Sequence, residues 1–155
     1  MTVDVKAKLA ELGIELPEAA VPVAAYIPAV RTGNLVFTAG QLPLVKGAIP
    51  FIGKVDGEVT PEQAKEMAQV CALNAIAAAG LVADINNIER VVQVRGFVNG
   101  VSGFVGHPGV VNGVSELFIK IWGDEKGKHA RTAIGVAELP LNAPVEVEVI
   151  FELCC

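Results

Sequence analysis

The residues best suited to chemistry lie near the C-terminal end of the chain. Arg131 carries a planar guanidinium group that can donate two parallel hydrogen bonds to a carboxylate and keeps its charge at any ordinary pH. Glu146 and Glu148 alternate with valines, so a strand here would place both carboxylates on one face. A carboxylate in a cleft can accept a proton from water and return it to a departing nitrogen. The same alternation is typical of any half-exposed strand, so the pattern alone leaves both interpretations open.

The histidines and cysteines are weaker candidates. His129 precedes Arg131 by two residues, which would place it at the mouth of the same site, although a solvated loop histidine is the simpler interpretation. His107 stands before Pro108 and suits a structural role at the start of a helix. Cys71 lies in an apolar helical stretch and is interpreted as a buried thiol rather than a nucleophile. With two histidines and no ligand-spaced cysteines or carboxylates, we expect no metal.

Composition and charge limit the classes to which the chain can belong. Its 155 residues suffice for one domain, 1–155, with residues 1–18 as an N-terminal extension. A net charge of -5 and only 5% aromatic residues argue against nucleic-acid binding, which needs clustered positive charge and stacking surfaces. The apolar stretch 19–30 is interrupted by prolines and too short for a membrane span, and the N-terminus lacks a signal-peptide core. We therefore expect a soluble cytoplasmic protein without membrane or nucleic-acid partners.

The elements that must position these residues follow from turn signals and apolar periodicity. Strands are predicted at 34–39, 48–52, 90–98, 132–139 and 145–153, and helices at 3–12, 61–79 and 110–122. Thr60 suits the N-cap of the helix at 61–79, with Gln63 completing a capping box, whereas the prolines between residues 19 and 29 predict irregular structure.

Without the short N-terminal helix, the predicted element order is ββαβαββ. This order predicts an α+β fold with a mainly antiparallel sheet and two helices on one face. The other face needs a cover, and with 52% apolar residues a homo-oligomer would supply it.

The glycine-rich segment 99–109 imitates a nucleotide-binding loop. Its spacing over residues 100–106 is G-x-x-G-x-x-G, whereas a dinucleotide fingerprint needs G-x-G-x-x-G and a P-loop needs Gly-Lys-Ser/Thr. We interpret the segment as a flexible connector that covers a pocket.

Several short motifs, taken together and in order, resemble those of the YjgF/RidA family of reactive-intermediate deaminases, also called endoribonuclease L-PSP. They occupy residues 33–34, 38–41, 97–98, 111–112, 129–131, 136–140 and 145–148. The resemblance extends over residues 20–153 and points to a longer YjgF-like subgroup. It implies a chorismate-mutase-like fold, a homotrimer and sites at the subunit interfaces.

The resemblance also implies individual roles. It assigns the substrate carboxylate to Arg131, water activation to Glu146, lining of the site to Tyr26 and Asn112, a backbone carbonyl to Gly40 and a backbone N–H to Ala133. Many relatives have a cysteine where this chain has Ala133, but a backbone N–H does not depend on the side chain.

The activity implied by the resemblance is the hydrolysis of reactive 2-enamino or 2-imino acids to 2-keto acids and ammonia, without a cofactor. Two alternatives stay open. The first is a regulatory protein that binds a small carboxylate without turnover. The second is an endoribonuclease, against which the acidic composition counts.

Overall fold

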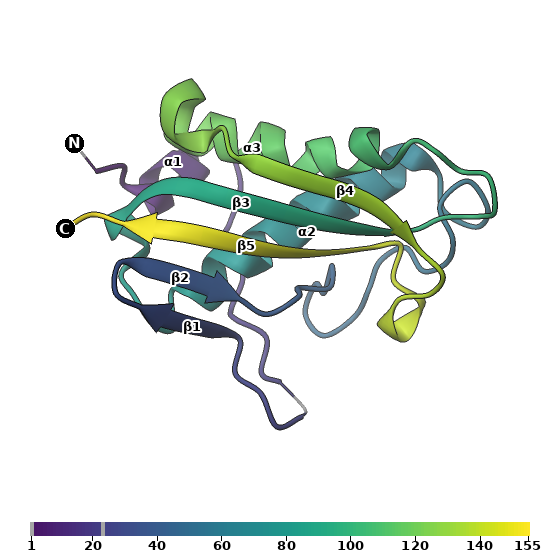
Figure 1. Ribbon diagram of the computed structural model, residues 1–155, viewed down its shortest axis with the longest axis horizontal. Helices are drawn as coiled ribbons and strands as arrows, with labels where there is room; N and C mark the ends of the chain where they lie inside the picture. Colours follow the sequence, from purple (N-terminus) through teal and green to yellow (C-terminus); the bar gives the residue numbers. More distant parts are fainter. Residues whose placement is uncertain (1, 23) are drawn as a thin grey trace.

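The computed structural model describes residues 2–22 and 24–155, and its centre is a five-stranded sheet (Figure 1). The regular elements are α1 (Val5–Glu11), β1 (Ala29–Thr32), β2 (Leu35–Thr38), α2 (Pro61–Ala79), η1 (Ile85–Asn87), β3 (Ile88–Asn99), α3 (His107–Gly127), β4 (Ala130–Val136), η2 (Pro140–Asn142) and β5 (Val145–Leu153). The strand order is β1-β2-β5-β3-β4. Strands β3 and β4 run parallel, and the other neighbouring pairs run antiparallel. The predicted α+β class with a mainly antiparallel sheet is confirmed.

The two long helices, α2 and α3, lie against one face of the sheet, as predicted (Figure 1). Helix α2 starts at the predicted capping box: the Thr60 hydroxyl accepts from the backbone N–H of Gln63 at 3.1 Å, and the Gln63 side chain accepts from the N–H of Thr60 at 2.9 Å. Cys71 is fully buried on this helix, and burial raises the pKa of its thiol. This thiol therefore serves the core, as the sequence indicated.

Strand β5 separates two environments. Its odd-numbered residues, from Val145 to Leu153, are buried against the helices, while Glu146 and Glu148 project half-buried from the opposite face. The opposite face also presents apolar side chains, namely Val30, Phe37 and Ile134, each between 39% and 48% exposed. Such open apolar area on a sheet face is typical of surfaces that another chain covers.

The first hairpin differs from the prediction. Strand β2 pairs with β1, through a two-residue loop in which Gly33 has φ +59°, as tight hairpins favour. The segment 48–52 was predicted as the partner, but it forms no strand and contributes a single bridge, between Val45 and Ala48. Pro50 cannot donate to a strand ladder, which interrupts this short segment. Strand β4 also ends at Val136, earlier than the predicted residue 139.

The glycine-rich segment makes several contacts with its surroundings. Near its start, Gly100 forms a parallel bridge with Val55, and the N–H of Val55 donates to the carbonyl of Asn99 at 2.8 Å. Phe104 then folds back, so that a Cβ on either Gly100 or Gly106 would crowd its ring.

Among the described residues, no helix is long and apolar enough to cross a membrane.

Candidate functional site

Arg131 lies on the edge strand β4, beside helix α3. Its Nη1 donates to Oδ1 of Asn112 at 2.8 Å and to Oγ of Ser115 at 3.2 Å. These two acceptors stand three residues apart on α3, a spacing that places them on one helix face. The structure therefore brings together two of the sequence-predicted residues, Arg131 and Asn112.

The guanidinium group keeps one bonding edge open. Both hydrogen bonds use Nη1, and within the described part of the chain Nε and Nη2 of Arg131 have no hydrogen-bond partner. Two parallel N–H groups on one edge match the two oxygens of a carboxylate. Arg131 is thus both anchored and able to bind an acid.

A second group of predicted residues forms around Glu146 on β5. The carboxylate of Glu146 packs directly over Gly40, where a Cβ would overlap Oε1. The backbone continues beside β5, because Gln41 and Val147 exchange two backbone hydrogen bonds of 2.8 and 3.1 Å. Only glycine lets the main chain approach the carboxylate so closely.

The environment of Glu146 favours its protonated form. Burial raises the pKa of this carboxyl group, and the like charge of Glu148 raises it further. Glu148 itself forms an ion pair with Arg95, with 2.8 Å between Oε1 and Nη1. A carboxyl group with a raised pKa is suited to exchange protons nearer to neutral pH.

These two groups do not meet within one chain. Residues that pair across neighbouring strands project to the same face. Arg131 pairs with the buried Val94 and therefore faces the helices, whereas Glu146 pairs with Phe97 on the opposite face. Strand β3 also lies between β4 and β5. One chain therefore carries two half-sites, here called the arginine half-site (Arg131, Asn112, Ser115) and the glutamate half-site (Glu146, Gly40).

The remaining predicted residues lie apart from these half-sites or on their border. Tyr26 is 53% exposed just before β1, at the sheet edge opposite β4. Ala133 lies on β4 two residues after Arg131 and, by strand alternation, shares its face. Among the described residues, no side-chain hydrogen bond or ring contact joins Tyr26 to either half-site.

His129 lies in the short loop between α3 and β4, as predicted, but its side chain is not fully solvated. Its ring is half-buried, with Nε2 2.9 Å from Oγ of Ser115 and Nδ1 2.6 Å from the carbonyl of Gly127. Ser115 was not among the predicted residues, although its spacing of three from Asn112 on a helix was a usable signal. Ser115 thus links His129 to Arg131.

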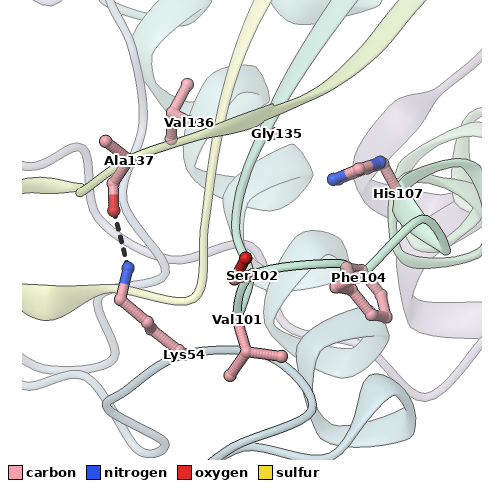
Figure 2. Close-up of a pocket in the computed structure, with 9 residues that line it drawn as sticks. Lys54, Val101, Ser102, Phe104, His107, Gly135, Val136 and Ala137 are labelled. Carbon is pink, nitrogen blue, oxygen red and sulfur yellow. Dashed lines mark hydrogen bonds between the residues drawn. The ribbon is translucent and has the colours of Figure 1, made fainter.

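A hollow of about 440 Å³ lies farther along β4, beyond the arginine half-site (Figure 2). It is lined by Lys54, Gly100, Val101, Ser102, Phe104, His107, Gly135, Val136 and Ala137. The glycine-rich segment thus lines a pocket, but that pocket contains none of the predicted site residues. Phe104 and His107 stand edge to face on one side of it, with ring centroids 5.3 Å apart.

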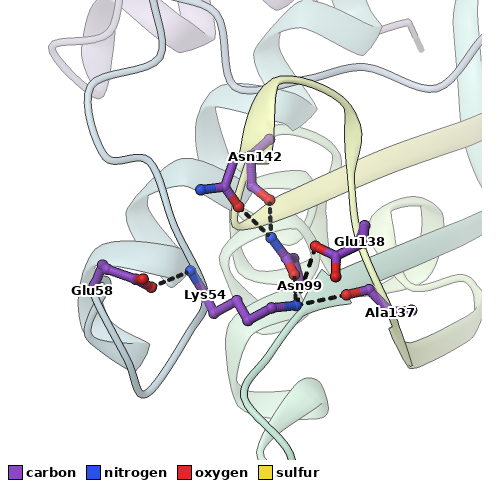
Figure 3. Close-up of polar contacts among 7 residues, drawn as sticks. Lys54, Glu58, Asn99, Ala137, Glu138 and Asn142 are labelled. Atoms are coloured by element: carbon purple, nitrogen blue, oxygen red, sulfur yellow. Dashed lines mark hydrogen bonds and ion pairs between the residues drawn. The ribbon is translucent and has the colours of Figure 1, made fainter.

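Lys54 at the rim of this hollow is already engaged (Figure 3). Its Nζ donates to the carbonyl of Ala137 at 2.6 Å and to Oδ1 of Asn99 at 2.8 Å, and it lies 3.4 Å from Oε2 of Glu138. Two hydrogen bonds and one ion pair thus hold the ammonium group. Lys54 therefore ties the loop before α2 to the end of β4.

In the described ranges, no three His, Cys, Asp or Glu residues gather as a metal site would require.

The topology and these residues define a class, an α+β fold with an arginine half-site and a glutamate half-site, and comparison with known proteins gives the family. The family model described as "YjgF/chorismate_mutase-like, putative endoribonuclease" matches residues 6–153, so the chain belongs to this family. The chain is 37% identical to Protein TCP17 of Trypanosoma cruzi over 150 residues, which are 96% of this chain and 94% of the relative.

Two further comparisons bear on fold and activity. The crystal structure of Atu1372 from Agrobacterium tumefaciens, a protein with unknown function, has a TM-score of 0.87 and 41% identity, covering 97% of this chain and 92% of that chain. A protein of Dermatophagoides farinae named 2-iminobutanoate/2-iminopropanoate deaminase is 29% identical over 88% of this chain and 92% of its own length. The family thus includes proteins named as deaminases.

Proposed function

We propose that this protein hydrolyses reactive 2-enamino and 2-imino acids to 2-keto acids and ammonia. The observation that carries the proposal is the open Nε and Nη2 edge of Arg131, which is anchored by Asn112 and suited to grip a small carboxylate. The carboxyl group of Glu146, whose pKa is raised, supplies a proton acceptor and donor. The deaminase name of the Dermatophagoides farinae relative supports the same chemistry.

The reaction needs three balanced steps. The enamine first gains a proton from solvent on its terminal carbon and becomes an iminium ion, which makes the carbon beside the carboxylate electrophilic. Water then attacks this carbon while the Glu146 carboxylate takes up the water proton. Finally, Glu146 returns the proton to nitrogen, the carbon–nitrogen bond breaks and ammonia leaves, while the new hydroxyl group gives its proton back to solvent and becomes the carbonyl. Arg131 holds the carboxylate throughout and gains or loses no proton.

The proposal includes a site shared between subunits of a homotrimer. Arg131 and Glu146 face opposite sides of one sheet, so both can contact one small molecule when the arginine half-site of one subunit adjoins the glutamate half-site of the next. The exposed apolar residues Phe37 and Ile134 support association through the sheet face that carries Glu146. Tyr26 and Ala133 are proposed to line the completed site.

The test is ammonia release from freshly generated 2-aminoacrylate. We expect wild-type protein to accelerate release and Arg131→Ala to abolish the acceleration, because the substrate loses its carboxylate anchor. Arg31→Ala is the matched control, since Arg31 is exposed on β1, at the other sheet edge, and among the described residues its side chain donates a single hydrogen bond, to the carbonyl of Gly33 at 3.1 Å. Equal rates for wild type and Arg131→Ala would overturn the proposal. Binding of a 2-keto acid that depends on Arg131 without any turnover would instead favour the regulatory binding protein.

A further inference from the structure

A chain of hydrogen bonds leads from Arg131 back to the last turn of helix α3. Nη1 of Arg131 donates to Oγ of Ser115 at 3.2 Å, and this oxygen is 2.9 Å from Nε2 of His129. On the far side of the ring, Nδ1 of His129 lies 2.6 Å from the carbonyl oxygen of Gly127. This chain of hydrogen bonds joins four residues one after another and ends on a backbone carbonyl.

The positions of the protons follow from the chemistry of each partner. The carbonyl of Gly127 can only accept, so Nδ1 of His129 must carry a proton. In a neutral ring, Nε2 then has no proton and accepts the hydroxyl proton of Ser115. The Ser115 oxygen keeps lone pairs that accept from Arg131. Each of these three hydrogen bonds therefore runs from a known donor to a known acceptor, and its direction is fixed.

The surroundings of the ring favour the neutral form that this arrangement needs. Burial lowers the pKa of His129 and the charge of Arg131 lowers it further, while the bond to Gly127 acts in the opposite direction. The ring also stands edge to face against the fully buried Phe118, with centroids 6.0 Å apart. The adjacent charge of Lys128 is paired with Asp124, 2.8 Å away. The core aromatic and the backbone thus hold the imidazole in place.

From this geometry we infer that His129 is a positioning residue for the carboxylate-binding arginine. The neutral ring orients the hydroxyl of Ser115, which together with Asn112 holds Nη1 of Arg131 and leaves the Nε and Nη2 edge for the ligand. The inference rests on the proposed function only for the identity of that ligand. His129 is not the proton acceptor of the reaction, because both of its nitrogens are engaged within the chain.

The first experiment needs no ligand and reads the ring directly. Nitrogen-15 NMR of histidine-labelled protein should show His129 as the Nδ1–H tautomer at neutral pH; the signals are assigned with His107→Asn, since the chain has 2 histidines. Ser115→Ala should move the Nε2 resonance toward that of an unbonded nitrogen. Arg131→Gln should raise the pKa of the ring, because a nearby positive charge is lost. A ring protonated on Nε2 at neutral pH would overturn the inference.

The second experiment measures the consequence for binding. Calorimetry with 2-oxobutanoate should show affinity weakened on the order of tenfold by His129→Ala and by Ser115→Ala, as expected for losing one hydrogen bond that supports a charged contact. His129→Gln should restore much of the affinity, because its amide oxygen can accept from Ser115. His107→Ala is the control, since this histidine packs on Phe104 away from Arg131.

The two experiments separate failure of the inference from failure of the proposed function. Unchanged affinity in His129→Ala and Ser115→Ala, with wild type binding well, would overturn the positioning role. If wild type neither binds a 2-keto acid nor accelerates imine hydrolysis, the proposed function fails, while the tautomer and the pKa response to Arg131→Gln still decide whether the hydrogen-bond chain exists.

Discussion

The carboxylate of Glu146 rests on the α-carbon of Gly40, so closely that a methyl group at Gly40 would overlap Oε1. Gly40→Ala should therefore displace the carboxylate and lower kcat for imine hydrolysis by at least about tenfold, since small misplacements of a catalytic group are costly. The end of a glutamate side chain can move, so the melting temperature should change little. Steady-state kinetics and thermal unfolding measure the two effects.

A double variant shows whether this effect acts through the carboxylate. Gly40→Ala added to Glu146→Gln should cause almost no further loss, because residues that act as one unit are not additive. Full additivity of the two losses would mean that the methyl group acts by another route.

The raised pKa of Glu146 predicts the pH dependence of the rate. Burial and the neighbouring Glu148 disfavour its charged form, so the acid limb of kcat/KM should lie at a higher pH than for an ordinary glutamate. Glu148→Gln removes the like charge and releases Arg95 from its ion pair. Loss of the like charge lowers the pKa of Glu146, and the limb should move to lower pH. A limb that stays in place would show that another group titrates.

The same shift has a consequence for stability. The folded state binds the proton of Glu146 more tightly than the unfolded state does, because the folded pKa is raised. The free energy of unfolding should therefore fall as the pH rises from the unfolded pKa through the folded pKa. Glu146→Gln should remove this component from a series of denaturant titrations, whereas Glu152→Gln, on the same strand face, should not.

The close approach of the two long helices predicts opposite effects at two glycines of α3. A Cβ at Gly113 would overlap the backbone carbonyl of Lys65 on α2, which cannot move aside easily, whereas a Cβ at Gly109 would meet nothing within 4 Å. Gly113→Ala should destabilise the protein by about 1–3 kcal/mol. Gly109→Ala should stabilise it by up to about 1 kcal/mol through helix propensity and unfolded-state entropy. Chemical denaturation of both variants compares them directly, and equal stabilities would contradict the packing argument.

The parts of the fold that could be predicted from the sequence are those with local signals. The capping box at Thr60 and the strict alternation of β5 fixed both elements correctly, because each pattern is contained within a few residues. The partner of β2 could not be found in this way. Segment 48–52 is the more apolar of the two candidates, whereas segment 29–32 contains Arg31 and Thr32, yet the tight loop at Gly33 and long-range packing select segment 29–32.

In the candidate site, too, the residues could be predicted from the sequence but their arrangement could not. The resemblance predicts Arg131 and Glu146 as site residues. Their opposite orientations, however, depend on the register of β3 with two neighbouring strands. The contact of Arg131 with Ser115 depends on how α3 returns alongside β4. Neither relationship is encoded in the spacing of the residues along the chain.

The opposite orientations of Arg131 and Glu146 lead to the last prediction, which concerns mixed oligomers. Arg131→Ala lacks the arginine half-site and Glu146→Gln lacks the glutamate half-site, so each variant alone should be inactive. If adjoining subunits share each site, unfolding and refolding an equal mixture should place an intact arginine half-site beside an intact glutamate half-site. Random assembly of a closed ring makes about one quarter of the sites complete. Imine hydrolysis should therefore recover to about one quarter of the wild-type rate.

Two controls make this result decisive. Each variant refolded alone should stay inactive, and a mixture of Arg131→Ala with the double variant Arg131→Ala/Glu146→Gln should stay inactive as well, because neither chain supplies the guanidinium group. Light scattering shows that the mixtures assemble to the same size as wild type. Normal assembly without recovered activity would mean that both groups act from one chain, which the opposite faces of the sheet argue against. Recovery that follows the proportion of mixed neighbours would establish that the guanidinium group and the carboxylate reach the substrate from different subunits.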